Sequence, residues 1–275
     1  MRNLLAGTRL SGDRVLQSTG LPMDVRLMRL TATALLLVFA TVLLCSAGNW
    51  VLRHPAFVLR AITVQGDVTH NNALTLRANT APRLTGNFLT LDLAQARSAF
   101  EAVPWVRHAV VRREFPNRLR VVLQEHQPEA LWGTESEPRL VNSLGEVFEA
   151  NVGDLEQADL PRLSGPDGQS ALVLAMYREL LGVLQPLDMA VEQLHLSGRG
   201  GWRAVLDSGA ALELGRGTPQ EVVARTQRFV ATLTQVASRY GRRVNTLEFA
   251  DLRHNDGYAL RLRGVSTLAQ DSTKK

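Results

Sequence analysis

The sequence predicts an α+β protein that is held in a membrane by a single N-terminal helix. The first observation is a stretch without charged residues, Leu30 to Leu52, which is dense in apolar residues. The second is that the rest of the chain mixes short β-rich runs with a few capped helical segments. The 223 residues from Arg53 to Lys275 exceed one average domain, so we expect two folded modules after the span.

The uncharged stretch is long enough to cross a bilayer once. At about 1.5 Å per residue it spans roughly 34 Å, against a hydrocarbon core of about 30 Å. Five arginines and only two acidic residues precede it, which predicts that residues 1–29 stay in the cytoplasm. The span is then residues 30–52, and everything after it lies outside the cytoplasm.

A cleaved signal peptide is the main alternative to an anchor. It is disfavoured by the 29 residues that precede the apolar core and by Cys45-Ser46-Ala47, which matches an A-x-A cleavage site poorly. Acylation of Cys45, as in a lipoprotein, is also disfavoured because Leu44 stands where a small residue is expected.

Composition argues against a nucleic-acid-binding protein. Although the pI is about 10.1, the part after the span has 26 basic and 24 acidic residues. Aromatic residues make up 5% of the chain, and no basic run is interleaved with them, as a stacking platform for nucleic acid requires. Cys45 is the single cysteine, so the exported modules contain no disulfide.

The first module reads as strand, helix, helix, strand, strand. We expect the segment Thr69 to Asn72 to cap the first helix at its N-terminus, and Asp92 to cap the second. The second helix should end before Pro104, and Pro116-Asn117 should form the turn between the last two strands. The expected elements are a strand Phe57–Gln65, a helix through Ala78, a helix Leu93–Ala102, and strands Trp105–Phe115 and Arg118–Gln124.

The second module begins near His126 and is mostly β. Thr218-Pro219-Gln220-Glu221 combines a capping box with proline at the first helical position. The first expected helix is Ser170–Leu184, with a buried stripe of Val173, Tyr177, Leu180, Leu181 and Leu184. The second starts at Thr218 and has a buried stripe of Val222, Phe229, Val230, Leu233 and Val236. Arg225 and Arg228 of this helix should lie outside the stripe. The expected strands are Ala130–Trp132, Arg139–Val141, Val191–Leu196, Trp202–Leu206, Ala211–Leu214, Thr246–Leu252 and Tyr258–Arg263.

Motifs for catalysis or metal binding are weak. The six histidines never fall at H-x-x-x-H spacing, and Gly198-Arg199-Gly200-Gly201 and Gly215-Arg216-Gly217 read as turns because neither completes a phosphate-binding fingerprint. Glu146 and Glu149 remain open as a paired-carboxylate site, since their separation in space is not readable from sequence. The sequence therefore favours a scaffold that binds proteins.

A scaffold needs a binding surface, and the segment from Leu252 to Arg263 is the candidate. If its strand is an exposed sheet edge, it offers unpaired backbone groups to an incoming strand, while nearby arginines favour an acidic one. The equal alternative is that this strand merely closes the sheet.

The chain resembles a known family in a run of motifs. These are Val103-Pro104-Trp105-Val106, Val110 and Arg112, Phe115-Pro116, Leu119-Arg120-Val121, and Glu125, Pro128, Ala130 and Trp132, followed by Gly198 to Trp202, Leu214 to Gly217 and Asp251-Leu252-Arg253. They resemble the bacterial FtsQ/DivIB cell-division family from about Phe57 to Gly264. The resemblance implies a POTRA domain over 57–125, an FtsQ-type, mostly antiparallel β domain over 126–265, and a polar tail over 266–275.

The resemblance also implies a function. It would be a non-catalytic inner-membrane protein of the division septum, with its C-terminal part in the periplasm and no cofactor, metal, nucleic acid or small-molecule substrate. Its partners would be the periplasmic regions of FtsB and FtsL and other division proteins. The implied binding residues are Arg199 and Leu252, Arg253, His254, Asn255, Asp256, Gly257 and Tyr258, with a second contact on the POTRA strand through Trp105, Val106, Val110 and Arg112. Many relatives carry an aromatic residue where this chain has His254.

Two other classes stay open at this point. One is a membrane-anchored cell-wall enzyme, which a peptidoglycan hydrolysis assay would reveal. The other is a POTRA-bearing secretion or assembly module, which would bind diverse extended peptides.

Overall fold

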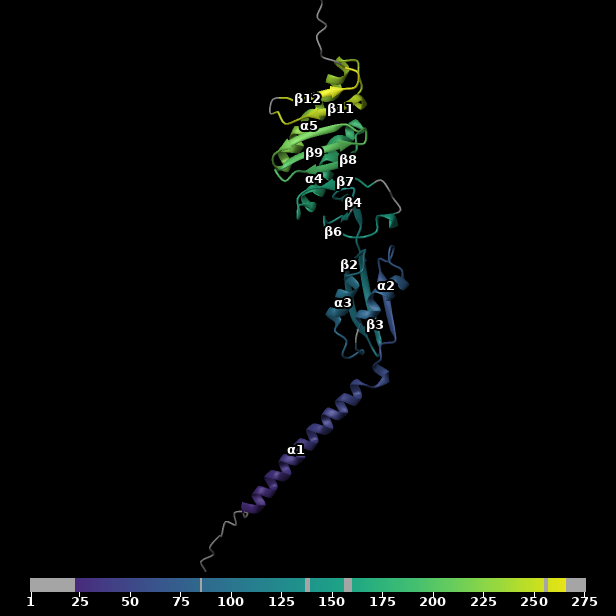
Figure 1. Cartoon of the computed structure of the whole chain (residues 1–275), viewed down its shortest axis with the longest axis vertical. Helices are drawn as coiled ribbons and strands as arrows, with labels where there is room; N and C mark the ends of the chain where they lie inside the picture. Colours follow the sequence, from purple (N-terminus) through teal and green to yellow (C-terminus); the bar gives the residue numbers. More distant parts are fainter. Residues whose placement is uncertain (1–22, 85, 137–138, 156–159, 255–256, 266–275) are drawn as a thin grey trace, which may run out of the picture. The chain divides into compact units, whose positions relative to one another are not determined.

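The computed structural model describes residues 23–84, 86–136, 139–155, 160–254 and 257–265, and the chain divides into two compact units, Met1–Val58 and Leu59–Lys275 (Figure 1). The first unit contains α1, Met23–Leu52. By length and composition it is able to cross a membrane, which suggests a membrane anchor. The helix begins at Met23 rather than Leu30, so Arg26 and Arg29 lie within it. Pro55 lacks the N–H needed to continue it.

The expected strand from Phe57 is wrong at its start. Pro55–Phe57 forms a 3₁₀ turn in which His54 Nδ1 accepts the N–H of Ala56, and the first strand, β1, is Ala61–Gly66. Proline favours such a turn because its φ is fixed near the helical value.

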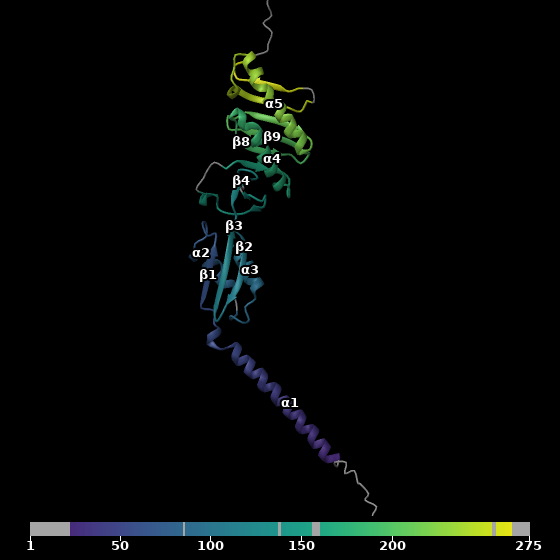
Figure 2. The same cartoon turned by 180° about the vertical axis from the view of Figure 1, so that it is seen from behind.

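The first module of the second unit has the predicted order of elements. It consists of β1, α2 (Ala73–Thr80), a 3₁₀ turn (Ala81–Arg83), α3 (Leu93–Glu101), β2 (Val106–Glu114) and β3 (Arg118–Glu125). Asn72 caps α2 by accepting the N–H of Thr75 at 2.8 Å, and Asp92 caps α3 through the N–H of Ala94, also at 2.8 Å. The strands lie in the order β1-β3-β2, with β1 parallel and β2 antiparallel to β3 (Figure 2).

The second module is built on a sheet that has nine strands within the described residues. The order is β12-β11-β10-β9-β8-β7-β4-β5-β6. The strands are β4 (Pro128–Trp132), β5 (Arg139–Asn142), β6 (Val147–Phe148), β7 (Arg162–Ser164), β8 (Val191–Leu196), β9 (Gly201–Leu206), β10 (Ala211–Arg216), β11 (Leu247–Asp251) and β12 (Ala259–Leu262). Only β4·β7, β7·β8 and β10·β11 pair in parallel, which confirms a mostly antiparallel α+β domain.

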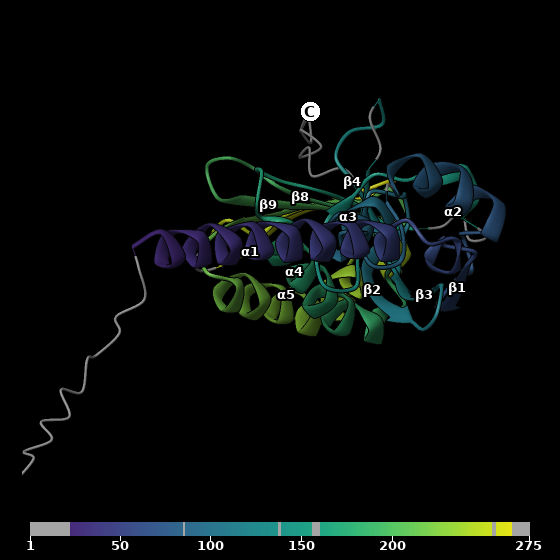
Figure 3. The same ribbon diagram turned by 90° about the horizontal axis from the view of Figure 1, so that it is seen from below.

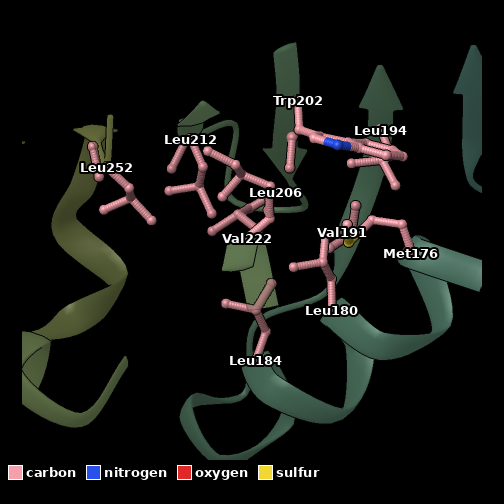
Figure 4. Close-up of a cluster of buried hydrophobic side chains, with 14 of the residues drawn as sticks. Met176, Leu180, Leu184, Val191, Leu194, Trp202, Leu206, Leu212, Val222 and Leu252 are labelled. Carbon is pink, nitrogen blue, oxygen red and sulfur yellow. The ribbon is translucent and has the colours of Figure 1, made fainter. Parts of the chain in front are cut away.

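Two helices cover one face of this sheet. They are α4 (Ser170–Leu184) and α5 (Pro219–Arg239), and Figure 3 shows them side by side beneath the strands. The predicted capping box of α5 is present, with Thr218 N–H donating to Glu221 Oε2 at 2.9 Å. In Figure 4 the side chains of α4 meet those of β8, β9 and β10 in one continuous core.

The buried faces of both helices differ from the predicted stripes. In α4, Leu174 and Met176 are buried, whereas Tyr177 is only half-buried, because α4 packs against α5 as well as against β7 and β8. In α5, Thr226 is buried and satisfies its hydroxyl by donating to the carbonyl of Val222 at 2.9 Å.

The two modules of the second unit meet through an aromatic cluster. Trp105 is buried, stacks on His70 with ring centroids 4.0 Å apart, and contacts the edge of Phe148 in β6 at 5.5 Å. Arg107 of β2 pairs with Glu146 through Nε–Oε2 at 2.7 Å and Nη2–Oε1 at 3.1 Å. This joint therefore combines apolar packing with a bidentate ion pair.

Candidate protein-binding site

The last described strand, β12, is an edge of the nine-stranded sheet. It pairs antiparallel with β11 through Leu247↔Leu262 to Asp251↔Ala259, and no described strand pairs with its other side. The backbone groups on that side can therefore accept a strand from another chain. Within the described residues the last strand is therefore an open edge, as the binding hypothesis requires.

A basic hollow of about 600 Å³ lies over β8, β9 and β10 of the same sheet and reaches Arg253, which follows β11, the strand that pairs with β12. Its lining is polar and rich in arginine: His195, Ser197, Arg199, Gly201, Trp202, Arg203, Glu213, Gly215, Arg216, Arg225 and Arg253. Five of them lie on the face of β8, β9 and β10 that points away from the helix-covered core: His195, Gly201, Arg203, Glu213 and Gly215. Trp202 belongs to that core, and Arg225 comes from α5. The hollow thus brings together Arg199 and Arg253, which are 54 positions apart in the sequence.

The arginines of the hollow differ in what holds them. Arg203 pairs with Glu213 at 3.3 Å. Arg225, which lies outside the buried stripe of α5 as predicted, is half-buried and donates to the carbonyls of Leu214 and Arg216. Arg199 and Arg216 are exposed and form no ion pair with any described residue. Two guanidinium groups are therefore available to an acidic ligand.

Arg253 is held in place by Asp251. Its Nε lies 2.8 Å from Asp251 Oδ1, its Nη2 lies 2.6 Å from Oδ2, and its own N–H donates to Oδ1 at 3.0 Å. These bonds lower the pKa of Asp251 from 3.8 to about 2 and raise the pKa of Arg253. The side chain of Arg253 is still 61% exposed, so its position is fixed while one side of the guanidinium remains open.

Gly215 makes room for this arrangement. Its φ is +83°, at an irregularity in the pairing of β9 with β10. A Cβ there would lie 2.8 Å from Arg225 Nη1 and 3.1 Å from Arg253 Cγ. The sequence predicted a turn at Gly215-Arg216-Gly217, but Gly215 and Arg216 belong to β10, and Gly215 lies at a strand irregularity over which two arginines pack.

The other predicted binding residues differ in how far they are exposed to solvent. His254 and Gly257 are exposed, and Tyr258 is half-buried, with its hydroxyl 2.8 Å from that of Thr232. Leu252 is buried in the core, so it supports the site from behind. The predictions for Asn255 and Asp256 lie outside the described residues.

The predicted contact on the first module needs revision. Trp105 and Val106 are buried and are not part of the surface. Val110 is half-buried and Arg112 is exposed on β2, which is an edge of its three-stranded sheet. Only these two of the four residues are able to face a partner.

One member of the acidic pair left open by the sequence, Glu146, is engaged in structural contacts. Glu146 accepts hydrogen bonds from Arg107 and, at 2.6 Å, from Asn142, and these lower its pKa from 4.5 to about 2. Such a group is ionised at neutral pH and is not a proton donor. No group of three or more metal-ligating side chains occurs within the parts of the chain that are described.

Comparison with known proteins places this architecture in a family. Residues 57–126 match the model of the POTRA domain, FtsQ-type, and residues 130–253 match that of the cell division protein FtsQ/DivIB, C-terminal. Both models describe parts of bacterial cell-division proteins, which is the class that the fold defines.

Relatives that match over most of their length give the same family. The chain is 42% identical over 254 residues to the cell division protein FtsQ of Burkholderia pseudomallei, covering 92% of this chain and 99% of the relative. It is 39% identical to that of Thiomonas arsenitoxydans (92% and 93% covered) and 41% identical to that of Bordetella pertussis (87% and 92% covered). The chain belongs to the FtsQ/DivIB family of cell division proteins, a family not known for enzymatic activity.

Proposed function

We propose that this chain is a non-catalytic scaffold of the division machinery that binds the periplasmic segments of FtsB and FtsL. In this proposal residues 1–29 are cytoplasmic, 30–52 cross the inner membrane, and the modules 57–125 and 126–265, with the tail 266–275, lie in the periplasm at the septum. By holding its partners, the scaffold controls septal peptidoglycan synthesis.

One observation carries the proposal: Arg253, which lines the basic hollow, lies just after β11, the strand that pairs with the open edge strand β12. Strand addition at β12 supplies main-chain hydrogen bonds, which bind any extended segment. Arg199, Arg216 and Arg253 select among such segments because a carboxylate is their best partner. The expected ligand is an acidic strand, which is the character that the resemblance ascribes to the docking segment of FtsB.

The arginines are suited to an interface for different reasons. Arg199 has no ion pair within the described residues, so binding breaks none. Arg253 is already oriented by Asp251, so less side-chain freedom is lost when a partner binds.

The test is the affinity of the full-length chain, in nanodiscs, for the purified periplasmic segment of FtsB from the same bacterium. Arg199→Glu should weaken binding by at least about 30-fold, the size of an interface hot spot of 2 kcal/mol. The matched control is Arg139→Glu, an exposed arginine on β5 near the other end of the sheet, which should bind like the unmutated chain. Equal affinity for all three chains would overturn the proposed site.

A further inference from the structure

The turn between β2 and β3 carries an aromatic side chain that points into solvent. Phe115 is 76% exposed, although its ring is held edge-on against that of Phe88, with centroids 6.3 Å apart. Arg113 fixes the backbone beneath this pair by donating to the carbonyl of Phe88 at 2.7 Å. Leu89, next to Phe88, is 40% exposed. The turn therefore presents a supported apolar tip.

The tip is surrounded by unpaired positive charge. Arg60, Arg112 and Arg118 are exposed and form no ion pair with any described residue, whereas Glu114 is neutralised by Arg120 at 2.7 Å. Arg60 and Arg118 line a hollow of about 520 Å³ together with Ala61, Glu114, Phe115, Pro116 and Asn117. Aromatic side chains flanked by arginine suit the headgroup layer of a bilayer, and guanidinium groups bind lipid phosphates in a bidentate fashion.

The tip is also the end of its module at which the chain enters. The N–H of Arg60 donates to the carbonyl of Asn117 at 3.0 Å, and Ala61 is in register with Arg118. Only residues 53–60 separate α1 from β1. Even a fully extended linker keeps Ala61 within about 30 Å of Leu52, whatever the orientation of the two units. If α1 lies in a membrane, this tip is tethered close to its surface.

We propose that the β2–β3 turn docks on the membrane that holds α1, with Phe115 at the level of the headgroups and Arg60 and Arg118 on the phosphates of anionic phospholipids. This contact restricts the tilt of the first module. It requires only that α1 is inserted, and it is independent of any partner at β12, so failure of either proposal leaves the other standing.

The experiment is hydrogen–deuterium exchange of the full-length chain in nanodiscs of phosphatidylcholine alone or with phosphatidylglycerol. Amides of residues 113–118 should exchange more slowly in the anionic discs, while those of the exposed turn at residues 207–209 should be unaffected by lipid charge. In the double variant Arg60→Gln, Arg118→Gln the equilibrium constant for docking should fall by roughly fivefold for each arginine removed, and the protection should fall with it. Phe115→Ser should also reduce the protection.

Unchanged exchange of the buried strand residues Leu119 and Val121 in each variant will show that the module is still folded. The proposal is overturned if residues 113–118 exchange equally fast in both kinds of disc, or if the double variant keeps the full protection by anionic lipid.

Discussion

Replacing Arg253 by glutamine should weaken the fold by a small amount that depends on pH. In the native chain Asp251 is 11% exposed at its side chain and relies on Arg253 for three hydrogen bonds to a guanidinium. Glutamine cannot supply the positive charge. The carboxylate of Asp251 then stays partly buried with a weaker partner, which raises its pKa toward or above 3.8.

The expected loss in the free energy of unfolding follows from the pKa of Asp251. Lowering it from 3.8 to about 2 would correspond to about 2.5 kcal/mol for a fully shielded pair. Because the side chain of Arg253 is 61% exposed, solvent screening reduces the expected loss to about 1 kcal/mol at pH 7. A carboxyl group whose pKa is lower in the folded chain than in the unfolded chain stabilises the fold at pH values above its unfolded pKa, here 3.8. This stabilisation is lost as the pH falls toward the folded pKa of about 2. The difference between the two chains should therefore shrink to about half at pH 3.

Urea denaturation of the detergent-solubilised full-length chain, followed by tryptophan fluorescence, measures this difference at pH 7 and at pH 3. Arg139→Gln is the control, since Arg139 forms no ion pair with a described residue and its loss should change little at either pH. A loss at Arg253 that is equally large at both pH values would refute the reasoning, because it would show that the ion pair with Asp251 is not its source.

Three further predictions concern the first module and its joint. Glu146→Gln should lower the free energy of unfolding by less than about 1 kcal/mol at pH 7, since its partner Arg107 is partly exposed, and the effect should fade below pH 4.5, as urea titrations over pH will show. Trp105→Ala should cost about 3–5 kcal/mol by the same assay because a buried ring is lost from the joint; a cost under 1 kcal/mol would contradict the packing. Gly66→Ala should lower the free energy of unfolding by at least about 2 kcal/mol, because φ is +99° and a Cβ would lie 2.1 Å from the carbonyl oxygen of Leu123. The melting temperature should fall, and an unchanged melting temperature would contradict the backbone conformation at Gly66.

The fold was largely predictable because its helices carry local signals. Asp92 and the Thr218 to Glu221 capping box mark helix starts within the sequence itself, and both act as expected. The short strands β6 and β7 were missed, since two or three residues leave no readable alternation. The order of nine strands was also not predictable, because it depends on pairings between distant segments.

The site was only partly predictable for a related reason. Arg199 and Arg253 were predicted from the family resemblance, and the structure places both in one hollow. Arg216 was missed because Gly215-Arg216-Gly217 reads as a turn; its end-of-strand position beside β9 becomes evident only once the pairing is known. Burial of Leu252 and Trp105 likewise depends on tertiary packing, because each lies just outside a strand and next to another buried residue.

The most direct test of the proposed scaffold is amide exchange along β12 when the FtsB segment is added to the full-length chain. If a partner strand pairs with the open edge, amides of residues 259–262 that face outward should exchange at least about tenfold more slowly, which corresponds to about 1.4 kcal/mol. Amides of β6, at the opposite edge of the same sheet, should not change. Protection at β6 instead, or binding without protection of β12, would contradict the account.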